Sequence, residues 1–221
     1  MRVATTTHRV ALDGTAGASE EPANLHRYLQ PTTLIPTDGI VRDTAMKITR
    51  SLTNELSRAR AIYDWIVDNT ARDPEVQGCG LGDIRWMLET GNLRGKCADL
   101  NALFVGLCRA AGLPARDLYG IRLAPSSDFP SLGRGGGNIT TAQHCRAEVY
   151  VDRYGWVPVD PADVRKVILE ERPQAPLTDP HVVDARERLF GSWEMNWIAF
   201  NDAHDVVLPG STGTPDRKSV V

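Results

Sequence analysis

Three residues, Cys97, His144 and Asp160, have the types and local settings that support acyl-transfer chemistry. Cys97 opens a segment, 97–111, whose apolar residues recur every three or four positions, as on one face of a helix. Free N–H groups and the positive dipole end at a helix start stabilise a thiolate, the form of cysteine that attacks carbonyl carbon. Cys97 is therefore the predicted nucleophile.

A predicted β-hairpin supplies the partners of this cysteine. Residues 144–151 and 156–160 have strand character and flank the turn 152–155. His144 and Asp160 lie on the same, less apolar face, at the open end of the hairpin, where strands run roughly 5 Å apart. A histidine oriented by a carboxylate can take a thiol proton and return it to a leaving amine. We therefore predict that His144 is the base and Asp160 its orienting group.

The other three cysteines have different settings. Cys108 lies on the apolar stripe of the predicted helix and Cys145 on the apolar face of the hairpin, so both are predicted to be structural. Cys79 lies between two glycines in a turn, and the sequence leaves open whether it is reactive or buried. No Cys-x-x-Cys pair occurs, and the strand neighbours His144 and Cys145 point to opposite faces. We expect no metal and no organic cofactor.

Other acidic residues compete with Asp160 for the orienting role. Asp152 falls in the hairpin turn and Asp163 lies beyond Pro161, while Asp99, in the first helical turn, is predicted to complement the helix dipole. The backbone N–H of Cys97 is one expected donor to an oxyanion. The second donor is left open among Asn92, Trp86 and Trp65.

Composition is that of a globular domain. The chain has 221 residues, 42% hydrophobic and 24% charged, with a net charge of −3, which gives no reason to expect nucleic acid or an anionic membrane as partner. No run of eighteen apolar residues and no apolar signal segment occurs, so as written a cytoplasmic location is expected. An exported or periplasmic location follows if the N-terminus has been trimmed.

The chain divides into three predicted regions: a strand and loop appendage over 1–37, the main domain over 38–208 and a flexible tail over 209–221. The loop 125–141, rich in glycine, is open to two interpretations, a lid or binding loop and a disordered insertion. The remaining predicted elements are helices over 40–49, 56–70 and 83–89 and strands over 2–12, 115–123 and 193–200.

The order of these motifs resembles the transglutaminase-like superfamily, and more narrowly its bacterial cysteine peptidase relatives. The resemblance covers residues 54–163. The motifs that carry it are Gly95-x-Cys97 with its apolar helix, Gly112-Leu113-Pro114-Ala115-Arg116, His144, and Tyr154-Gly155-Trp156-Val157-Pro158-Val159-Asp160-Pro161.

The resemblance implies a papain-like α+β fold in which the nucleophile helix packs on an antiparallel sheet. It also implies a thioester on Cys97, with His144 as base and acid and Asp160 as orienter. Many relatives have a small residue and then an aromatic after the histidine, whereas this chain has Cys145 and Arg146. We expect Arg146 to bind an acidic substrate group or to narrow the pocket, and Trp156, on the same face, to contact substrate.

The expected activity is cysteine-dependent acyl transfer on amide bonds of a protein or peptide. Water as acceptor gives hydrolysis, by a peptidase or a deamidase, and an amine gives cross-linking. Hydrolysis is the favoured outcome for a domain this small. The alternative is a catalytically silent transglutaminase-like fold that serves as a binding module, since fold and motif do not guarantee activity.

Overall fold

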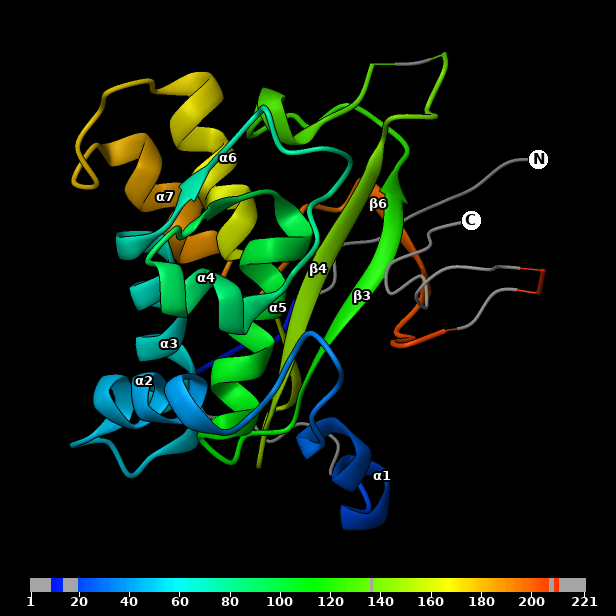
Figure 1. The fold of residues 1–221 in the computed structure, drawn as a ribbon. Coiled ribbons are helices and arrows are strands. Elements are labelled where there is room, and N and C mark those ends of the chain that lie inside the picture. The colour runs from blue at the N-terminus through cyan, green and yellow to red at the C-terminus, as the bar shows by residue number, and fades with distance from the viewer. Residues whose placement is uncertain (1–8, 14–19, 136, 207–208, 211–221) are drawn as a thin grey trace.

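The computed structural model describes residues 9–13, 20–135, 137–206 and 209–210. Its centre is a four-stranded antiparallel sheet in the order β5-β4-β3-β6. Helices α2 to α7 gather on one side of this sheet, and α5 lies directly against β4 (Figure 1). The predicted α+β fold, with the nucleophile helix packed on an antiparallel sheet, is confirmed. The strands are β3 (Ala115–Arg122), β4 (Gln143–Val151), β5 (Gly155–Val159) and β6 (Trp197–Asn201).

Helix α5 (Cys97–Ala110) is the core of the molecule, and its residues are buried from Cys97 to Arg109. A helix that is surrounded by protein needs apolar or small residues on every side, and this segment supplies them except at Asp99, Asn101 and Arg109, whose side chains are hydrogen-bonded. At its start, the Asp99 carboxylate accepts hydrogen bonds from the backbone N–H groups of Lys96 (2.9 Å) and Gly82 (2.6 Å). Asp99, which was predicted to complement the helix dipole, thus also connects the start of α5 to the loop that carries Cys79.

The remaining helices pack around α5. They are α1 (Pro22–His26), α2 (Gly39–Thr49), α3 (Glu55–Asn69), α4 (Ile84–Thr90), α6 (Pro161–Glu171) and α7 (Pro180–Arg188), with 3₁₀ turns η1 (Arg27–Leu29) and η2 (Pro130–Leu132). Two short parallel strands, β1 (Ala71–Arg72) and β2 (Arg94–Gly95), hold the chain just before α5. None of the helices in the described ranges combines the length and apolar character needed to cross a bilayer.

The predicted hairpin forms as β4 and β5, with Ala147 opposite Val159 and Tyr150 opposite Trp156. Left-handed backbone at Arg153 (φ 79°) and Gly155 (φ 73°) closes the turn. Asp160 follows β5 directly and caps the start of α6. The hairpin therefore places Asp160 next to the end of β4 where His144 lies.

The N-terminal region contacts the rest of the domain. Residues 22–29 form α1 and η1, for which no element was predicted, and Ile35, 1% exposed, packs into the main core. Arg109 of α5 donates a hydrogen bond to the backbone oxygen of Gln30 (2.9 Å). Of the predicted strand over 2–12, residues 2–8 lie outside the described residues, and Arg9 forms an isolated bridge with Ser192. The predicted tail lies outside the described residues except for 209–210.

The loop 125–141 is anchored along part of its length. Leu132 of η2 is buried, and its backbone oxygen accepts hydrogen bonds from Arg122 (2.6 Å) and Asn196 (2.9 Å). The N–H of Ser131 donates to Glu171 of α6 (2.7 Å). These contacts favour the interpretation of 125–141 as a binding loop over that of a disordered insertion, and Gly133, Arg134 and Thr141 of this loop line the cleft described below. The predicted last strand is shorter than expected, because only 197–201 pairs with β3.

Candidate active site

Cys97 lies at the first position of α5 and faces a cleft of about 340 Å³. Its side chain is almost fully buried, with 4% of the residue exposed. The N–H of a first helical residue has no partner within its helix, so it can serve an anion at this position. A larger hollow of about 460 Å³ lies beside Phe190 and Trp193, and neither Cys97 nor His144 lines it. The chemistry therefore belongs to the smaller cleft.

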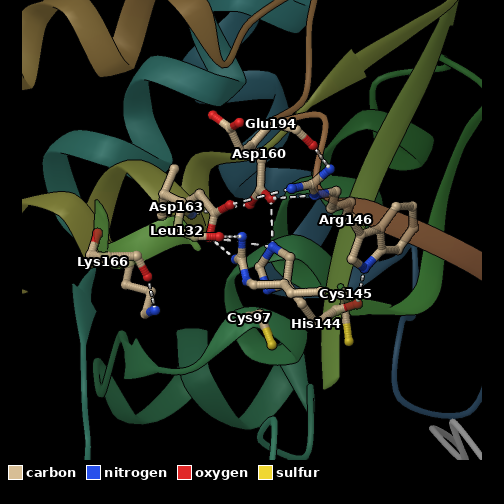
Figure 2. A network of polar contacts seen from close by, with 12 residues as sticks. Cys97, Leu132, His144, Cys145, Arg146, Asp160, Asp163, Lys166 and Glu194 are labelled. Atoms are coloured by element: carbon tan, nitrogen blue, oxygen red, sulfur yellow. Dashed lines mark hydrogen bonds and ion pairs between the residues drawn. The ribbon is translucent and has the colours of Figure 1, made fainter. Parts of the chain in front are cut away.

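His144 and Asp160 meet as the hairpin predicts. His144 Nε2 lies 2.7 Å from Asp160 Oδ2, and both side chains are buried (Figure 2). With Nε2 held by the carboxylate, Nδ1 is the ring nitrogen that can exchange a proton with Cys97, whose side chain lies next to the His144 ring (Figure 2). The structure thus brings together all three residues predicted from the sequence.

A second carboxylate, Asp163, shares this site. Its Oδ1 lies 3.3 Å from His144 Nε2, and it accepts a hydrogen bond from Arg122 at 2.5 Å. Arg146 lies on the far side of the two carboxylates, with its Nε 3.4 Å from Asp160 and its Nη2 3.9 Å from Asp163. Two guanidinium groups therefore balance two buried carboxylates, which leaves no excess negative charge there to attract a metal cation.

The charges around His144 favour its imidazolium form. Burial and the Arg122 guanidinium lower the pKa of His144, but the carboxylates of Asp163 and Asp160 outweigh them and raise it to about 9. Burial and Asp163 raise the pKa of Asp160, whereas Arg122 and His144 hold that of Asp163 well below its usual range, against the effect of burial. The lowered pKa of Asp163 favours its carboxylate form next to the His144 ring.

Three thiols lie close together at this site, and two of them, Cys79 and Cys97, line the cleft. The sulfur atoms of Cys79, Cys97 and Cys145 lie within 4.8 Å of one another. The neighbouring Cys145 and Cys79 thiols, and then His144, lower the pKa of Cys97 well below its usual range despite burial, whereas Cys79, Cys97 and burial raise the pKa of Cys145. The raised pKa of Cys145 favours its thiol form beside the Cys97 sulfur.

The prediction that Cys145 is buried is confirmed, but its side chain belongs to the site rather than to a remote part of the core. Cys79, which the sequence left open, lines the cleft. Three sulfur atoms at this spacing have the layout of a soft-metal site, yet five arginine and lysine side chains line the same cleft and oppose a further cation. We assign no metal to it. Cys108 is fully buried, as predicted.

Asp160 is held by the fold from two directions. Its Oδ1 accepts a hydrogen bond from the N–H of Asp163 (3.0 Å), as the N-cap of α6, and one from Asn101 Nδ2 (3.4 Å). Asn101, on α5, also donates to the backbone oxygen of Cys145 (2.8 Å). One side chain thus ties the nucleophile helix, the histidine strand and the carboxylate together.

The two predicted substrate-binding residues lie elsewhere. Arg146 is 1% exposed and donates to the backbone oxygen of Glu194 (2.5 Å), so its guanidinium offers no surface to a substrate. Trp156 stacks edge-on against Tyr28 and Tyr150, with the Arg116 guanidinium over its ring, and it is outside the lining of the cleft. It is paired with Tyr150, six residues along β4 from His144, roughly 20 Å away. Both expectations are corrected by these positions.

The three proposed oxyanion donors also lie outside the cleft lining. Asn92 and Trp86 are exposed, and Trp65 packs against the core. Gln143, directly before His144, lines the cleft and carries a side-chain amide. Sequence reasoning missed Gln143, Asn101 and Arg122. The position of Gln143 next to the histidine was the available signal; burial of Asn101 and Arg122 depends on contacts between distant segments.

Comparisons with known proteins agree with this geometry. The model of the transglutaminase-like superfamily matches residues 42–161, more than half of the chain. This chain belongs to that superfamily. An uncharacterized protein of Haemophilus influenzae is 44% identical over 194 residues, which are 84% of this chain and 52% of that protein. YebA of Bacillus subtilis, also uncharacterized, is 28% identical over 152 residues, 65% of this chain and 20% of YebA.

The fold has solved counterparts. The periplasmic domain of TgpA from Pseudomonas aeruginosa superposes with a TM-score of 0.51 at 20% identity, over 71% of this chain and 52% of that domain. The family match confirms the superfamily predicted from the sequence motifs, and this structural similarity agrees with the predicted fold. The chain spans about half the length of the Haemophilus relative and a fifth of YebA.

Proposed function

We propose that this transglutaminase-like domain is a cysteine-dependent enzyme that transfers acyl groups from amide bonds of peptides or proteins, with water as the acceptor. The observation that carries the proposal is the alignment of one buried histidine between a carboxylate, 2.7 Å from Nε2, and a cysteine at a helix start. A carboxylate that fixes the ring leaves Nδ1 aimed at the sulfur, which is the arrangement that thiol acyl transfer needs.

The proposed reaction runs in two halves. His144 takes the proton of Cys97, and the thiolate attacks the amide carbon to give a tetrahedral oxyanion. The Cys97 N–H and the Gln143 amide are the proposed donors to that oxygen. His144 then gives its proton to the leaving amine, which departs and leaves a thioester on Cys97. Water, deprotonated by His144, attacks the thioester, the acid is released, and Cys97 leaves as the thiolate beside the His144 imidazolium.

The two carboxylates and two guanidinium groups next to His144 stabilise its charged form in this scheme. The Asp160 and Asp163 carboxylates stabilise the imidazolium that exists while the proton is on the ring. Arg122 and Arg146 offset the cost of burying both carboxylates. The pKa of His144 is raised to about 9 and that of Cys97 is lowered well below its usual range, and both shifts favour a thiolate–imidazolium pair.

The test uses a defined mixture of synthetic peptides incubated with the parent protein and with Cys97→Ser and His144→Ala. Mass spectrometry separates new peptide ends, conversion of glutamine to glutamate, and incorporation of an added amine. We expect the first or second product from the parent only. Thermal unfolding of each variant checks that it is folded. A parent without any of the three products, or variants that are as active as the parent, would overturn the proposal.

A further inference from the structure

The cleft in front of Cys97 is strongly cationic. No aspartate or glutamate is among the described residues that line it, although the whole chain carries a net charge of −3. The positive charge is therefore local rather than a property of the protein as a whole. The charged side chains that line the cleft are Arg72, Lys96, Arg122, Arg134 and Lys166.

Three of these cations have carboxylate partners outside the lining. Arg122 is paired with buried Asp163 at 2.5 Å. Arg72 and Lys166 share one carboxylate, that of the exposed Glu170, at 3.6 and 3.5 Å. One carboxylate cannot neutralise two cations, so part of the positive charge on this wall is left over.

Lys96 and Arg134 have no carboxylate of the described residues within 4 Å of their charged nitrogens. Of the acidic groups near Lys96, the Asp99 carboxylate accepts hydrogen bonds from the backbone N–H groups of Lys96 (2.9 Å) and Gly82 (2.6 Å), and Asp73 is engaged by Arg94 at 3.4 Å. Within the part of the chain that the structure describes, the Arg134 side chain donates to neutral oxygens, the hydroxyl of Thr141 (2.9 Å) and the backbone of Asn138 (3.3 Å). Both side chains are half-buried, so solvent screens them less than a fully exposed charge.

These two cations come from different walls. Lys96 directly precedes Cys97, on the side of β2 and α5, whereas Arg134 belongs to the loop after η2, on the side of His144. Burial and the Arg122 guanidinium also lower the pKa of Lys166, which agrees with crowded positive charge along the cleft. Fixed charges of one sign inside a concave site concentrate ligands of the opposite sign.

We propose that Lys96 and Arg134 form an anion subsite beside the reacting sulfur, and that the substrates of this domain are peptides with a carboxylate next to the amide bond that reacts. The choice of acidic peptides rests on the proposed function; the anion subsite itself does not. In this proposal Lys96 and Arg134, rather than Arg146, select acidic substrates, because Arg146 is buried next to Asp160 and Asp163.

The test compares two alkylating agents of similar size, neutral iodoacetamide and anionic iodoacetate, on the folded protein. The rate of Cys97 modification is read by peptide mass spectrometry. The variants are Lys96→Gln and Arg134→Gln, alone and combined, and Lys47→Gln, an exposed cation on α2, is the matched control. The ratio of the iodoacetate rate to the iodoacetamide rate cancels changes in the intrinsic reactivity of the sulfur.

We expect the ratio to fall about tenfold in the double variant, partly in each single variant and not in Lys47→Gln, and to fall in the parent as salt is raised. A ratio that neither the double variant nor salt changes overturns the subsite. Slow reaction of the parent with both reagents instead means that Cys97 is not activated, which is a failure of the proposed function and is distinguishable from the first result.

A second measurement tests the substrate class. Short peptide amides that differ only in glutamate against glutamine are added during alkylation of the parent by iodoacetamide. We expect the glutamate peptide to protect Cys97 at several-fold lower concentration, and the difference to disappear in Lys96→Gln/Arg134→Gln. Equal protection by the two peptides would contradict acidic specificity.

Discussion

Replacement of Asp160 by asparagine isolates the electrostatic part of the proposed site. Asparagine has nearly the same shape and retains a side-chain oxygen. That oxygen can still accept from the Asp163 N–H at 3.0 Å and from Asn101 at 3.4 Å, and asparagine is a good helix N-cap. The substitution therefore removes the charge 2.7 Å from His144 Nε2 and keeps the start of α6.

The size of the effect follows from the His144 environment. The rise of its pKa from 6.5 to about 9 corresponds to about 3 kcal/mol in favour of the imidazolium, at about 1.4 kcal/mol per pH unit. Two carboxylates, at 2.7 and 3.3 Å, supply this preference against burial and Arg122. If they share it equally, loss of Asp160 costs at least about 1.5 kcal/mol, and the His144 pKa falls to about 8 or below.

The assay is an NMR titration of the histidine ring carbons, with the His144 resonance assigned by its absence from His144→Ala. Asp179→Asn is the matched control, because Asp179 is also a helix N-cap, of α7, outside the site. We expect the midpoint near 9 in the parent and in the control, and near 8 or lower in Asp160→Asn. A parent midpoint close to 6.5, or equal midpoints in parent and Asp160→Asn, would refute the argument.

Three further predictions follow from single contacts. Cys145→Ala removes a thiol that donates to Cys97, so the pKa of Cys97 should rise and its alkylation should begin at higher pH than in the parent; an unchanged pH profile would count against the thiol contact. Arg146→Gln leaves Asp160 and Asp163 with less compensating charge and should lower the free energy of unfolding by about 3–5 kcal/mol in urea titrations, whereas exposed Arg153→Gln should have little effect. Gly80→Ala places a Cβ 1.8 Å from Asp99 Oδ2 at a left-handed position (φ 96°), so it should lower the melting temperature. An unchanged melting temperature would contradict the close contact between this loop and Asp99 of α5.

The pH dependence of stability has a defined direction. The folded-state pKa of His144, about 9, lies above the ordinary value of 6.5, so its contribution is fully present below pH 6.5 and is lost as the pH rises through 9. We expect the parent to lose more stability than His144→Ala between these limits, measured by urea unfolding at each pH. Parallel curves for the two proteins would contradict a raised histidine pKa.

The sequence was sufficient for the parts of the site that depend on local periodicity. A three- and four-residue apolar spacing located α5 and put Cys97 at its start. A two-residue period located the hairpin and put His144 and Asp160 at its open end. These patterns are local because hydrogen bonding within a helix or a hairpin fixes which neighbours share a face.

The errors arose where burial depends on distant segments. Arg146 shares the face of His144, but the chain around Glu194 covers it. Asp163 was discounted for its position after Pro161, although the first turn of α6 returns it to the histidine. The error on Trp156 was avoidable, because a residue beside the turn of an antiparallel hairpin lies far from the open end.

The most direct test of the proposed acyl-transfer function is capture of the thioester. The protein is mixed with an activated ester such as p-nitrophenyl acetate at neutral pH, quenched in acid within the first turnover, digested and analysed by mass spectrometry. We expect an acetyl group on the Cys97 peptide that hydroxylamine removes, and much slower formation of this group in His144→Ala. Absence of the acetyl group from Cys97, or equal rates in the parent and His144→Ala, would contradict it.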